Sequence, residues 1–236
     1  MNYKLLSSVL IICFTCTFAK AQNGFYFGPK GGLTIGVQNW NETERKPLLA
    51  YHFSAFIESI DIDYKGALFA QFGYHTRGSS LSIINLTSGL RLSDGYKFRN
   101  LSFVLGAKKR LITEKLSTPY YFFGIRGEYN IANNLASFQD RFSNSLFYPQ
   151  ELFVNDFTYG MSIGGGIEFL GSAYIQPAIE FTISPDLSLQ YQSPAIPNVI
   201  SPYDGRTITI GERRIRNITF EISFILRFLR EVIYVD

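Results

Sequence analysis

The segment Asn217–Phe228 reads NITFEISFILRF and changes in character at every second residue. One set is wholly apolar and comprises Ile218, Phe220, Ile222, Phe224, Leu226 and Phe228. The other set is mostly polar and comprises Asn217, Thr219, Glu221, Ser223, Ile225 and Arg227. Successive side chains of a strand point to opposite faces, whereas a helix needs apolar residues three and four apart, so this pattern predicts a two-faced strand. Its length suits a tilted strand that crosses a bilayer, which takes roughly 9–11 residues.

The same alternation appears in earlier segments of the chain. We expect seven more strands, at about 25–37, 48–60, 66–77, 96–108, 120–131, 157–169 and 173–183. The connections between the strands are in turn medium, short, long, short, long, very short and long, and outer-membrane barrels alternate short turns with longer loops in this way. The sequence therefore predicts an all-β fold, an eight-stranded antiparallel up-and-down transmembrane β-barrel with both termini on the short-turn side.

The N-terminus has the three parts of a secretory signal peptide. Lys4 precedes an apolar run, Leu5–Phe18, and Ala19-Lys20-Ala21 forms a small-x-small cleavage site. A transmembrane anchor is the alternative, but a spanning helix needs roughly 20 apolar residues and this run is shorter. We therefore expect cleavage after Ala21, which divides the chain into a signal peptide (1–21) and a barrel domain (22–236).

Both cysteines, Cys13 and Cys16, lie in the segment predicted to be removed. A lipoprotein is the alternative reading, but Ile12 and Thr15 precede the cysteines where a small residue is usual. A mature chain without cysteine has no disulfide framework, thiolate metal site or cysteine nucleophile. Removal of the two signal-peptide lysines leaves 20 cations against 19 acids, and this balance gives no support for a nucleic-acid partner.

Alternation alone does not say which face of each strand points inward. A soluble, lipocalin-like barrel would place the apolar set around a ligand cavity and the polar set in water. The polar set, however, is rich in small residues, which include Gly28, Gly32, Gly36, Gly160, Ser162, Gly164 and Gly166. Glycine weakens a water-facing strand, but inside an eight-stranded barrel small residues make room for larger ones opposite. We therefore expect the bulky apolar set to face lipid and the polar set to line the lumen.

The predicted lumen contains charges and histidines. The expected polar network comprises Lys30, His52, Glu58, His75, Arg126, Glu128, Glu168, Glu180, Glu221 and Arg227. Arg77 is expected in the same network or at its rim. Charges in a narrow interior must be paired or they cost several kcal/mol each, so the sequence predicts a salt-bridged, plugged barrel. A small-solute channel is the alternative, although an eight-stranded barrel rarely leaves an open bore.

Catalysis and cofactor binding have little support in the sequence. His52, Ser54 and Glu58 share one face of one strand and have the residue types of a hydrolase site. His52 and Glu58 lie about 20 Å apart along a strand, however, and face the lumen rather than the lipid. Two histidines without a carboxylate at ligand spacing are a weak case for a metal. We therefore predict no catalytic residues, no metal and no cofactor.

Several short motifs carry a resemblance to a known family. They are Gly28-Pro29-Lys30-Gly31-Gly32-Leu33, Trp40-Asn41, Leu49-Ala50-Tyr51-His52, Phe56-Ile57-Glu58, Gly73-Tyr74-His75-Thr76-Arg77-Gly78-Ser79 and Phe98-Arg99-Asn100-Leu101-Ser102. With these motifs the chain resembles the PorT-like outer-membrane β-barrel proteins of Bacteroidota. The resemblance implies an eight-stranded outer-membrane barrel from a family linked to type IX secretion, in which some members are described as porin-like. One departure is that Phe228 is followed by Leu229–Asp236, whereas outer-membrane barrels often end on an aromatic residue.

The sequence thus favours a non-enzymatic scaffold or surface-interaction protein in the outer membrane of a Gram-negative cell envelope. A small porin is the alternative, and a lipid-modifying enzyme is a weaker one. The expected partners are outer-membrane lipid, the outer-membrane assembly machinery, and envelope or secretion-system proteins. Loops on a rigid scaffold usually carry function, so we expect partners at the long connections 78–95, 132–156 and 184–212.

Overall fold

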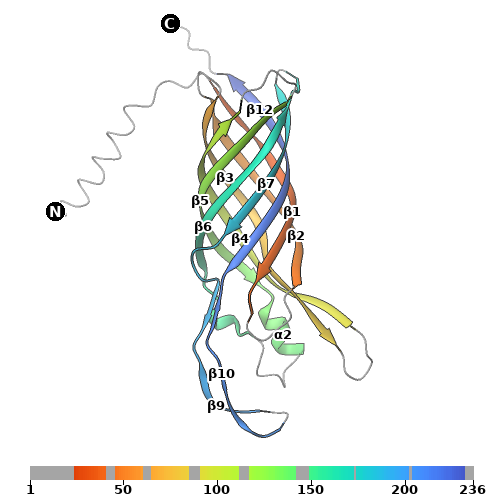
Figure 1. Ribbon diagram of the computed structural model, residues 1–236, viewed down its shortest axis with the longest axis vertical. Helices are drawn as coiled ribbons and strands as arrows, with labels where there is room; N and C mark the ends of the chain where they lie inside the picture. Colours follow the sequence, from red (N-terminus) through yellow and green to blue (C-terminus); the bar gives the residue numbers. More distant parts are fainter. Residues whose placement is uncertain are drawn as a thin grey trace, which may run out of the picture.

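The structure is a computed structural model that describes residues 24–40, 46–60, 65–84, 91–111, 117–141, 149–172, 174–201 and 204–231. The predicted signal peptide lies outside the described residues. In the described part, eight long strands form a closed antiparallel barrel, and a narrow ribbon extends from one end (Figure 1). The barrel strands are β1 (Gly24–Gln38), β2 (Lys46–Ser59), β3 (Gly66–Ile84), β4 (Arg91–Arg110), β5 (Ser117–Asn133), β6 (Phe157–Phe169), β7 (Ile175–Pro185) and β12 (Asn217–Glu231).

The ring closes where the first barrel strand meets the last. Val37 of β1 lies opposite Ile218 of β12, and Phe27 lies opposite Phe228 further along the same seam. Every other barrel strand pairs with its neighbours in the sequence, so each of the eight has two partners. Closure leaves no strand edge in the wall, which a hydrocarbon environment requires because lipid cannot hydrogen-bond the backbone. The predicted fold class is confirmed.

The two ends of the barrel differ. One end carries the connections 60–65, 111–116 and 170–174 together with the pair Gly24 and Glu231, and we call it the short-turn end. The opposite end carries the connections after β1, β3, β5 and β7, and we call it the long-loop end. In Figure 1 the long-loop end points downward and the ribbon extends from it.

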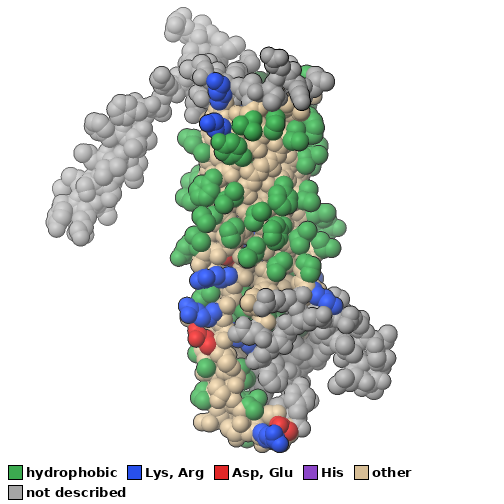
Figure 2. Space-filling model, viewed as in Figure 1, with side chains coloured by type: hydrophobic (Ala, Val, Ile, Leu, Met, Phe, Trp, Pro, Cys, Tyr) green, Lys and Arg blue, Asp and Glu red, His purple; other side chains and the backbone are tan. Residues whose placement is uncertain are grey.

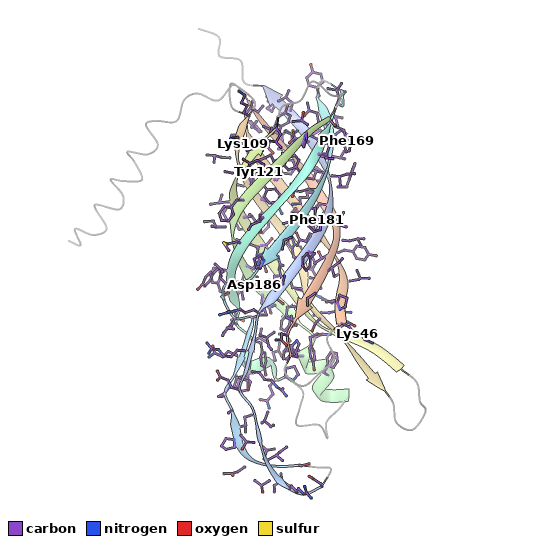
Figure 3. All side chains as sticks on the ribbon, in the orientation of Figure 1. Lys46, Lys109, Tyr121, Phe169, Phe181 and Asp186 are labelled. Carbon is purple, nitrogen blue, oxygen red and sulfur yellow. The ribbon has the colours of Figure 1, made fainter. Side chains whose placement is uncertain are left out.

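The wall of the barrel has an apolar outside and a polar inside. Phe53 is 61% exposed, whereas the next residue, Ser54, is 1% exposed. On β12 the corresponding values are 53% for Phe224 and 1% for Ser223. Apolar side chains cover the barrel wall in Figure 2, and Figure 3 shows Tyr121, Phe169 and Phe181 on the outer surface. A belt of this kind is the outer surface of a transmembrane barrel, so the predicted assignment of the two faces is confirmed.

Strands β3 and β4 are longer than the sequence predicted. They were expected to end at 77 and to begin at 96, but they stay paired as far as Ile84 and Arg91. Most of the expected loop 78–95 is therefore a hairpin that continues past the barrel (Figure 1). A hairpin outside the membrane does not need an apolar face, so the alternation that marks the other strands fades in this segment.

The other two expected loops also contain regular structure. Within 184–212, and just beyond it, β8 (Tyr191–Ser193) pairs with β11 (Arg213–Ile215), and β9 (Ile196–Ile200) pairs with β10 (Thr207–Ile210). Within 132–156 lie α2 (Leu135–Arg141) and the 3₁₀ turn η1 (Glu151–Phe153). Prolines such as Pro194 divide the ribbon into short strands, because proline is confined to edges and ends of strands. Among the described residues, no helix is both long and apolar enough to cross a membrane.

Glycines in the wall make room for aromatic rings inside the barrel. A Cβ added to Gly164 would lie 2.6 Å from the ring of Phe122, and one added to Gly166 would lie 2.6 Å from the hydroxyl oxygen of Tyr120. Each added Cβ would also lie 2.3 Å from a backbone carbonyl oxygen of β7, that of Phe181 or Ile179, so these glycines admit both the aromatic ring and the close approach of the neighbouring strand. The lumen is therefore filled by pairing small residues with large ones.

Replacement of Gly164 by leucine tests this packing. The new side chain enters the lumen against Phe122, and we expect the free energy of unfolding to fall by about 3 kcal/mol because the interior is overpacked. Urea unfolding of the refolded protein in lipid vesicles measures the change. Ile163→Leu, on the adjacent lipid-facing position, is the matched control and should cost less than about 1.5 kcal/mol. Equal losses for the two variants would contradict the filled lumen.

Candidate functional site

The lumen is the candidate site, because it gathers nearly all the buried charge of the described chain. The structure places all ten side chains of the predicted polar network inside the barrel, each of them buried: Lys30, His52, Glu58, His75, Arg126, Glu128, Glu168, Glu180, Glu221 and Arg227. Four further charged side chains join them: Arg77, Lys108, Arg110 and Asp186. Together they form three layers along the barrel axis.

The first layer lies near the short-turn end and consists of Glu58, Glu168, Lys108, Arg110 and Arg227. Lys108 Nζ lies 2.5 Å from Glu58 and 3.4 Å from Glu168, while Arg110 pairs with the same two carboxylates. Arg227 also bridges both, at 3.2 Å from Glu58 and 2.8 Å from Glu168. Four strands, β2, β4, β6 and β12, are thereby joined across the lumen by shared carboxylates.

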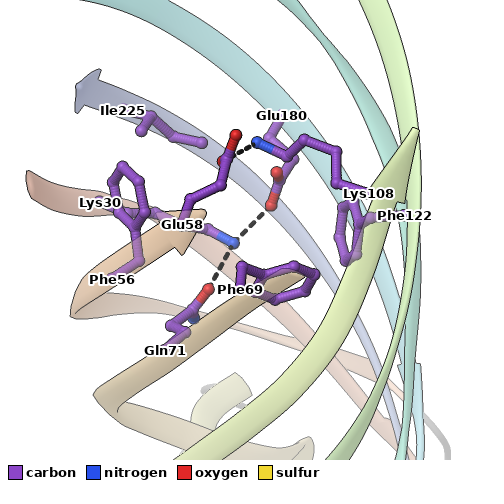
Figure 4. A pocket seen from close by; sticks show the side chains of 9 residues that line it. All are labelled: Lys30, Phe56, Glu58, Phe69, Gln71, Lys108, Phe122, Glu180 and Ile225. Carbon is purple, nitrogen blue, oxygen red and sulfur yellow. Dashed lines mark hydrogen bonds and ion pairs between the residues drawn. The ribbon is translucent and has the colours of Figure 1, made fainter. Parts of the chain in front are cut away.

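The middle layer is centred on Lys30 (Figure 4). Its Nζ lies 2.5 Å from Oε1 of Glu180 and donates a hydrogen bond to Gln71 at 3.2 Å. The hydroxyl of Tyr120 donates to the other carboxylate oxygen of Glu180 at 2.7 Å. Phe56, Phe69 and Phe122 surround these polar groups, so the ion pair is enclosed by aromatic rings as well as hydrogen-bonded. The cavity left between these side chains measures about 20 Å³, room for about one water molecule.

The third layer lies toward the long-loop end and is centred on Arg77. Its guanidinium donates two hydrogen bonds to the Glu128 carboxylate, from Nε to Oε2 at 2.7 Å and from Nη2 to Oε1 at 2.6 Å. Its Nη1 donates to the hydroxyl of Thr219. Arg126 lies 3.1 Å from Glu128 and pairs with Asp186, which Figure 3 places near this end of the barrel. A forked contact of this type is the strong form of an arginine–carboxylate pair.

Two histidines lie beside the third layer. His52 and His75 are stacked, with ring centroids 5.2 Å apart and planes within 2° of parallel. His52 contacts Thr34 at 2.9 Å and Ser223 at 3.0 Å, and His75 contacts Glu221 at 2.8 Å through Nδ1. The other ring nitrogen of His75, Nε2, is buried without a hydrogen-bond partner. His75 lines a cavity of about 10 Å³, at the lower limit for one water molecule.

His52, His75 and Glu221 are close enough together to raise the question of a metal ion. One ligand atom from each lies within 4.8 Å of the others. An imidazole binds a metal in the plane of its ring, however, and two parallel stacked rings do not direct their lone pairs at one point. The cluster in this geometry is therefore a hydrogen-bonded part of the lumen. The sequence did not reveal it, because Glu221 comes from a strand 146 residues away from His75.

The trio His52, Ser54 and Glu58 is not brought together. Ser54 donates to the backbone carbonyl of Lys30 at 3.5 Å, and Glu58 is occupied by cations of the first layer. His52 instead contacts the hydroxyls of two other strands. A nucleophile needs its base within hydrogen-bond reach, and these contacts direct each of the three side chains elsewhere.

An apolar cluster covers the lumen at the long-loop end. It consists of Trp40, Tyr96, Phe98, Leu135, Phe138, Tyr191 and Ile215, and we call it the cap cluster. The Trp40 ring lies 4.7 Å from that of Tyr96 and 5.3 Å from that of Tyr191, between centroids. Its indole nitrogen donates to Gln38 at 2.9 Å, which joins the cap to the polar groups beneath it. Burial raises the pKa of the Tyr191 phenol, so this group stays neutral within the cluster.

The charges of the lumen balance. In the described residues of the barrel interior, six cations face six carboxylates: Lys30, Arg77, Lys108, Arg110, Arg126 and Arg227 against Glu58, Glu128, Glu168, Glu180, Asp186 and Glu221. This balance needs no charge on either histidine. Neutrality lowers the cost of enclosing so many ions, because each charge has an opposite charge within contact distance.

Strand parity explains which of the four added residues were missed. Lys108 and Arg110 continue the inward series from Val104, but the expected strand 96–108 ends at the first of them and excludes the second. Asp186 follows Thr182 and Ser184 in the same way, but it lay in the proline-rich connection. Arg77 was anticipated as part of the network or its rim. Extension of the inward series past the last apolar residue would have found the missing members.

Comparisons with known proteins give similarity to solved structures only. No family model matches the chain, and no curated protein matches it by sequence. Among solved structures, it is similar to neisserial surface protein A, at 8% identity over 89% of this chain and 99% of that chain, with a TM-score of 0.48. It is also similar to the outer membrane protein OprG from Pseudomonas aeruginosa, at 11% identity over 88% and 97%, with a TM-score of 0.48.

The outer membrane protease OmpT from Escherichia coli is another similar structure, at 9% identity over 91% of this chain and 100% of that chain, with a TM-score of 0.40. At such low identities and TM-scores these likenesses assign no activity to the chain. The resemblance to the PorT-like family stays a prediction. What the geometry itself defines is a transmembrane β-barrel whose interior is closed by ion pairs.

Replacement of Arg77 by methionine tests whether the lumen is dry. The change removes one of the two arginines that pair with Glu128 and leaves only Arg126. Breaking a buried pair in this way should lower the free energy of unfolding by about 3–5 kcal/mol. Arg206→Ser is the matched control, because its pair with Asp204 is exposed and should be worth less than about 1 kcal/mol. Urea titration in lipid vesicles measures both.

The double variant Arg77→Met/Glu128→Met should lose less stability than Arg77→Met alone, since two opposite charges leave together. If Arg77→Met were as mild as Arg206→Ser, the lumen would have to be filled with water.

Proposed function

We propose that this protein is an integral outer-membrane barrel of a Gram-negative cell that acts as a closed, non-enzymatic scaffold and offers an interaction surface at its long-loop end. The observation that carries the proposal is the lumen. Shared carboxylates connect strands across the barrel in every layer, and the cavities between them measure about 20 Å³ and 10 Å³.

Membrane placement follows from the outer wall together with the predicted export signal. Leu49, Leu68 and Ile125 are each more than 60% exposed. A continuous exposed apolar surface is unfavourable in water and indicates contact with lipid or protein. In an outer-membrane barrel the short turns face the periplasm and the longer loops face outward. The long-loop end of this chain is then the part that meets other molecules outside the cell.

The architecture of the long-loop end supports a role in presentation. The cap cluster fixes α2 and the base of the β8–β11 ribbon on the barrel mouth, and the β3–β4 hairpin extends beside them. Regular structure held in this way positions side chains more rigidly than a free loop. The same cap closes the path that a transported solute would need.

The partners of this surface are proposed from the sequence. The resemblance to PorT-like proteins points to envelope or secretion-system proteins, and insertion of any such barrel requires lipid and the assembly machinery. A nucleic-acid partner has no support in the charge balance. A lipid-modifying activity has no support in the lumen either, because His52 is buried there rather than at the lipid-facing wall.

Conductance separates the scaffold from a small porin. We expect the purified protein to give no steady single-channel current in planar bilayers, because the ion pairs leave no continuous aqueous path. Heat-modifiable migration of the same sample on gels verifies that the barrel is folded, and a general porin added to the same bilayer verifies the assay. A steady current that changes when Arg77 or Glu128 is substituted would contradict the scaffold function and show that the protein is a channel.

Co-purification tests the surface role. We expect envelope proteins that co-purify with the full chain from detergent-solubilised outer membranes to be lost when residues 194–212 are replaced by a short glycine linker. A variant with the short-turn connection 170–174 replaced by the same linker is the control. Identical sets of partners in both variants would remove the ribbon from the proposed surface.

A further inference from the structure

The ribbon beyond the barrel has two edges that differ. Strands β9 and β10 pair only with each other among the described residues, so each has an outer edge without a neighbouring strand. An unpaired edge is a row of free N–H and C=O groups, and proteins usually protect such edges with proline, charge or a bulge. The two edges of this ribbon are protected to different extents.

The β9 edge is interrupted. Pro197 has no N–H to offer, and Asn198 adopts a left-handed conformation with φ of 59°. Ile208 lies opposite Val199, and Ile210 lies opposite Ile196. Between these two pairs β10 advances by two residues and β9 by three, so β9 has one extra residue. The bulge is therefore in β9, and an added strand could not follow this edge in regular register.

The β10 edge is regular. The Ser201 N–H donates to the Arg206 carbonyl at 2.8 Å, so this carbonyl points toward β9. By alternation along β10, the N–H and C=O groups of Thr207 and Thr209 point away from β9, toward the free edge. The strand reads Thr-Ile-Thr-Ile, which is wholly β-branched and contains no charge, proline or glycine. The strand is short, but no charge, proline or bulge interrupts this edge.

We propose that the free edge of β10 is a strand-addition site for an extended polypeptide segment with acidic residues at its ends. The proposal rests on the proposed function and names the class of partner that the long-loop end receives. Backbone hydrogen bonds to Thr207 and Thr209 provide the register, and the flanking charges of the ribbon select the partner.

The charges around β10 select an acidic partner. The segment 204–216 contains three exposed arginines, Arg206, Arg214 and Arg216, and two carboxylates, whereas its fourth arginine, Arg213, is buried. Arg206 lies 3.6 Å from Asp204, and Arg214 lies 3.8 Å from Glu212, with all four side chains at least 49% exposed. Exposed pairs at such distances contribute little, so Arg206 and Arg214 are available to carboxylates of an incoming chain. A second copy of this ribbon would bring its own arginines against these, which disfavours self-pairing.

The fold permits a clean test of the edge. Thr209→Pro removes an N–H that faces away from β9, and proline is tolerated at that kind of position on an edge strand. Thr209→Ala removes the side chain but keeps the N–H, and serves as the matched control. The probe is a fluorescent synthetic peptide of alternating valine and threonine with two aspartates at each end, and a second peptide carries lysines in place of the aspartates.

Fluorescence anisotropy with the full chain in lipid nanodiscs measures binding. We expect saturable binding of the acidic peptide, about tenfold weaker binding to Thr209→Pro because backbone hydrogen bonds are lost, and little change for Thr209→Ala. The lysine peptide should bind the unaltered protein at least about tenfold more weakly than the acidic one. Amide hydrogen exchange should slow at Thr207 and Thr209 when the acidic peptide is bound.

Three outcomes would overturn the proposal. They are no binding of the acidic peptide up to about 1 mM, equal binding by Thr209→Pro and Thr209→Ala, and concentration-dependent dimers that Thr209→Pro abolishes. The second outcome would mean adsorption by charge alone, and the third would mean that a second copy occupies the edge. None of these outcomes bears on whether the lumen is closed. A steady pore current, in contrast, would contradict the proposed scaffold function, so failure of the strand-addition proposal and failure of the proposed function are distinguishable.

Discussion

The constraint on which this structure depends is the cost of leaving a charge or a backbone polar group unpaired away from water. In the wall, hydrocarbon satisfies none of the backbone groups, and closure of β1 onto β12 leaves no strand edge open to it. Closure with eight strands then makes the interior so narrow that inward charges must meet one another. The contact of Arg77 with Glu128 and Thr219 is the clearest result, since it joins three strands through one fully buried guanidinium.

Packing of the lumen follows from the same narrowness. A ring such as Phe122 has space only where the facing wall residue lacks a Cβ, as at Gly164. Enclosure of ions by aromatic rings also places cations over ring faces, as with Arg227, whose guanidinium carbon lies 3.9 Å from the centroid of Tyr26. Salt bridges, glycines and aromatic rings therefore act together to keep the interior filled. The described interior is thus filled and neutral in charge.

Much of this could be predicted from sequence, because one rule governs the whole wall. Lipid outside and a crowded lumen inside force each strand into an alternation of period two, which is readable in Asn217–Phe228 and in seven other segments. The same rule placed His52 and Glu221 in the lumen. It did not show that Glu221 meets His75, since pairing across the barrel depends on register, stagger and strand tilt rather than on local pattern. Arg110 and Asp186 were missed where polar residues at strand ends hid the continuing parity.

Outside the membrane, strands need not alternate between lipid-facing and lumen-facing residues, so the sequence pattern of period two is lost there. The β3–β4 extension and the ribbon continue past the lipid-facing wall, where an alternation of period two is not required, and prolines such as Pro194 and Pro197 are typical of loops. The same change of environment alters what an edge means. Within lipid an open edge is excluded, and the barrel has none. In water an edge is tolerated, and Pro197 and Asn198 disrupt one edge of the ribbon while β10 keeps its backbone groups in regular order on the other. An edge left regular beside one that is disrupted is a difference that selection for solubility alone does not explain.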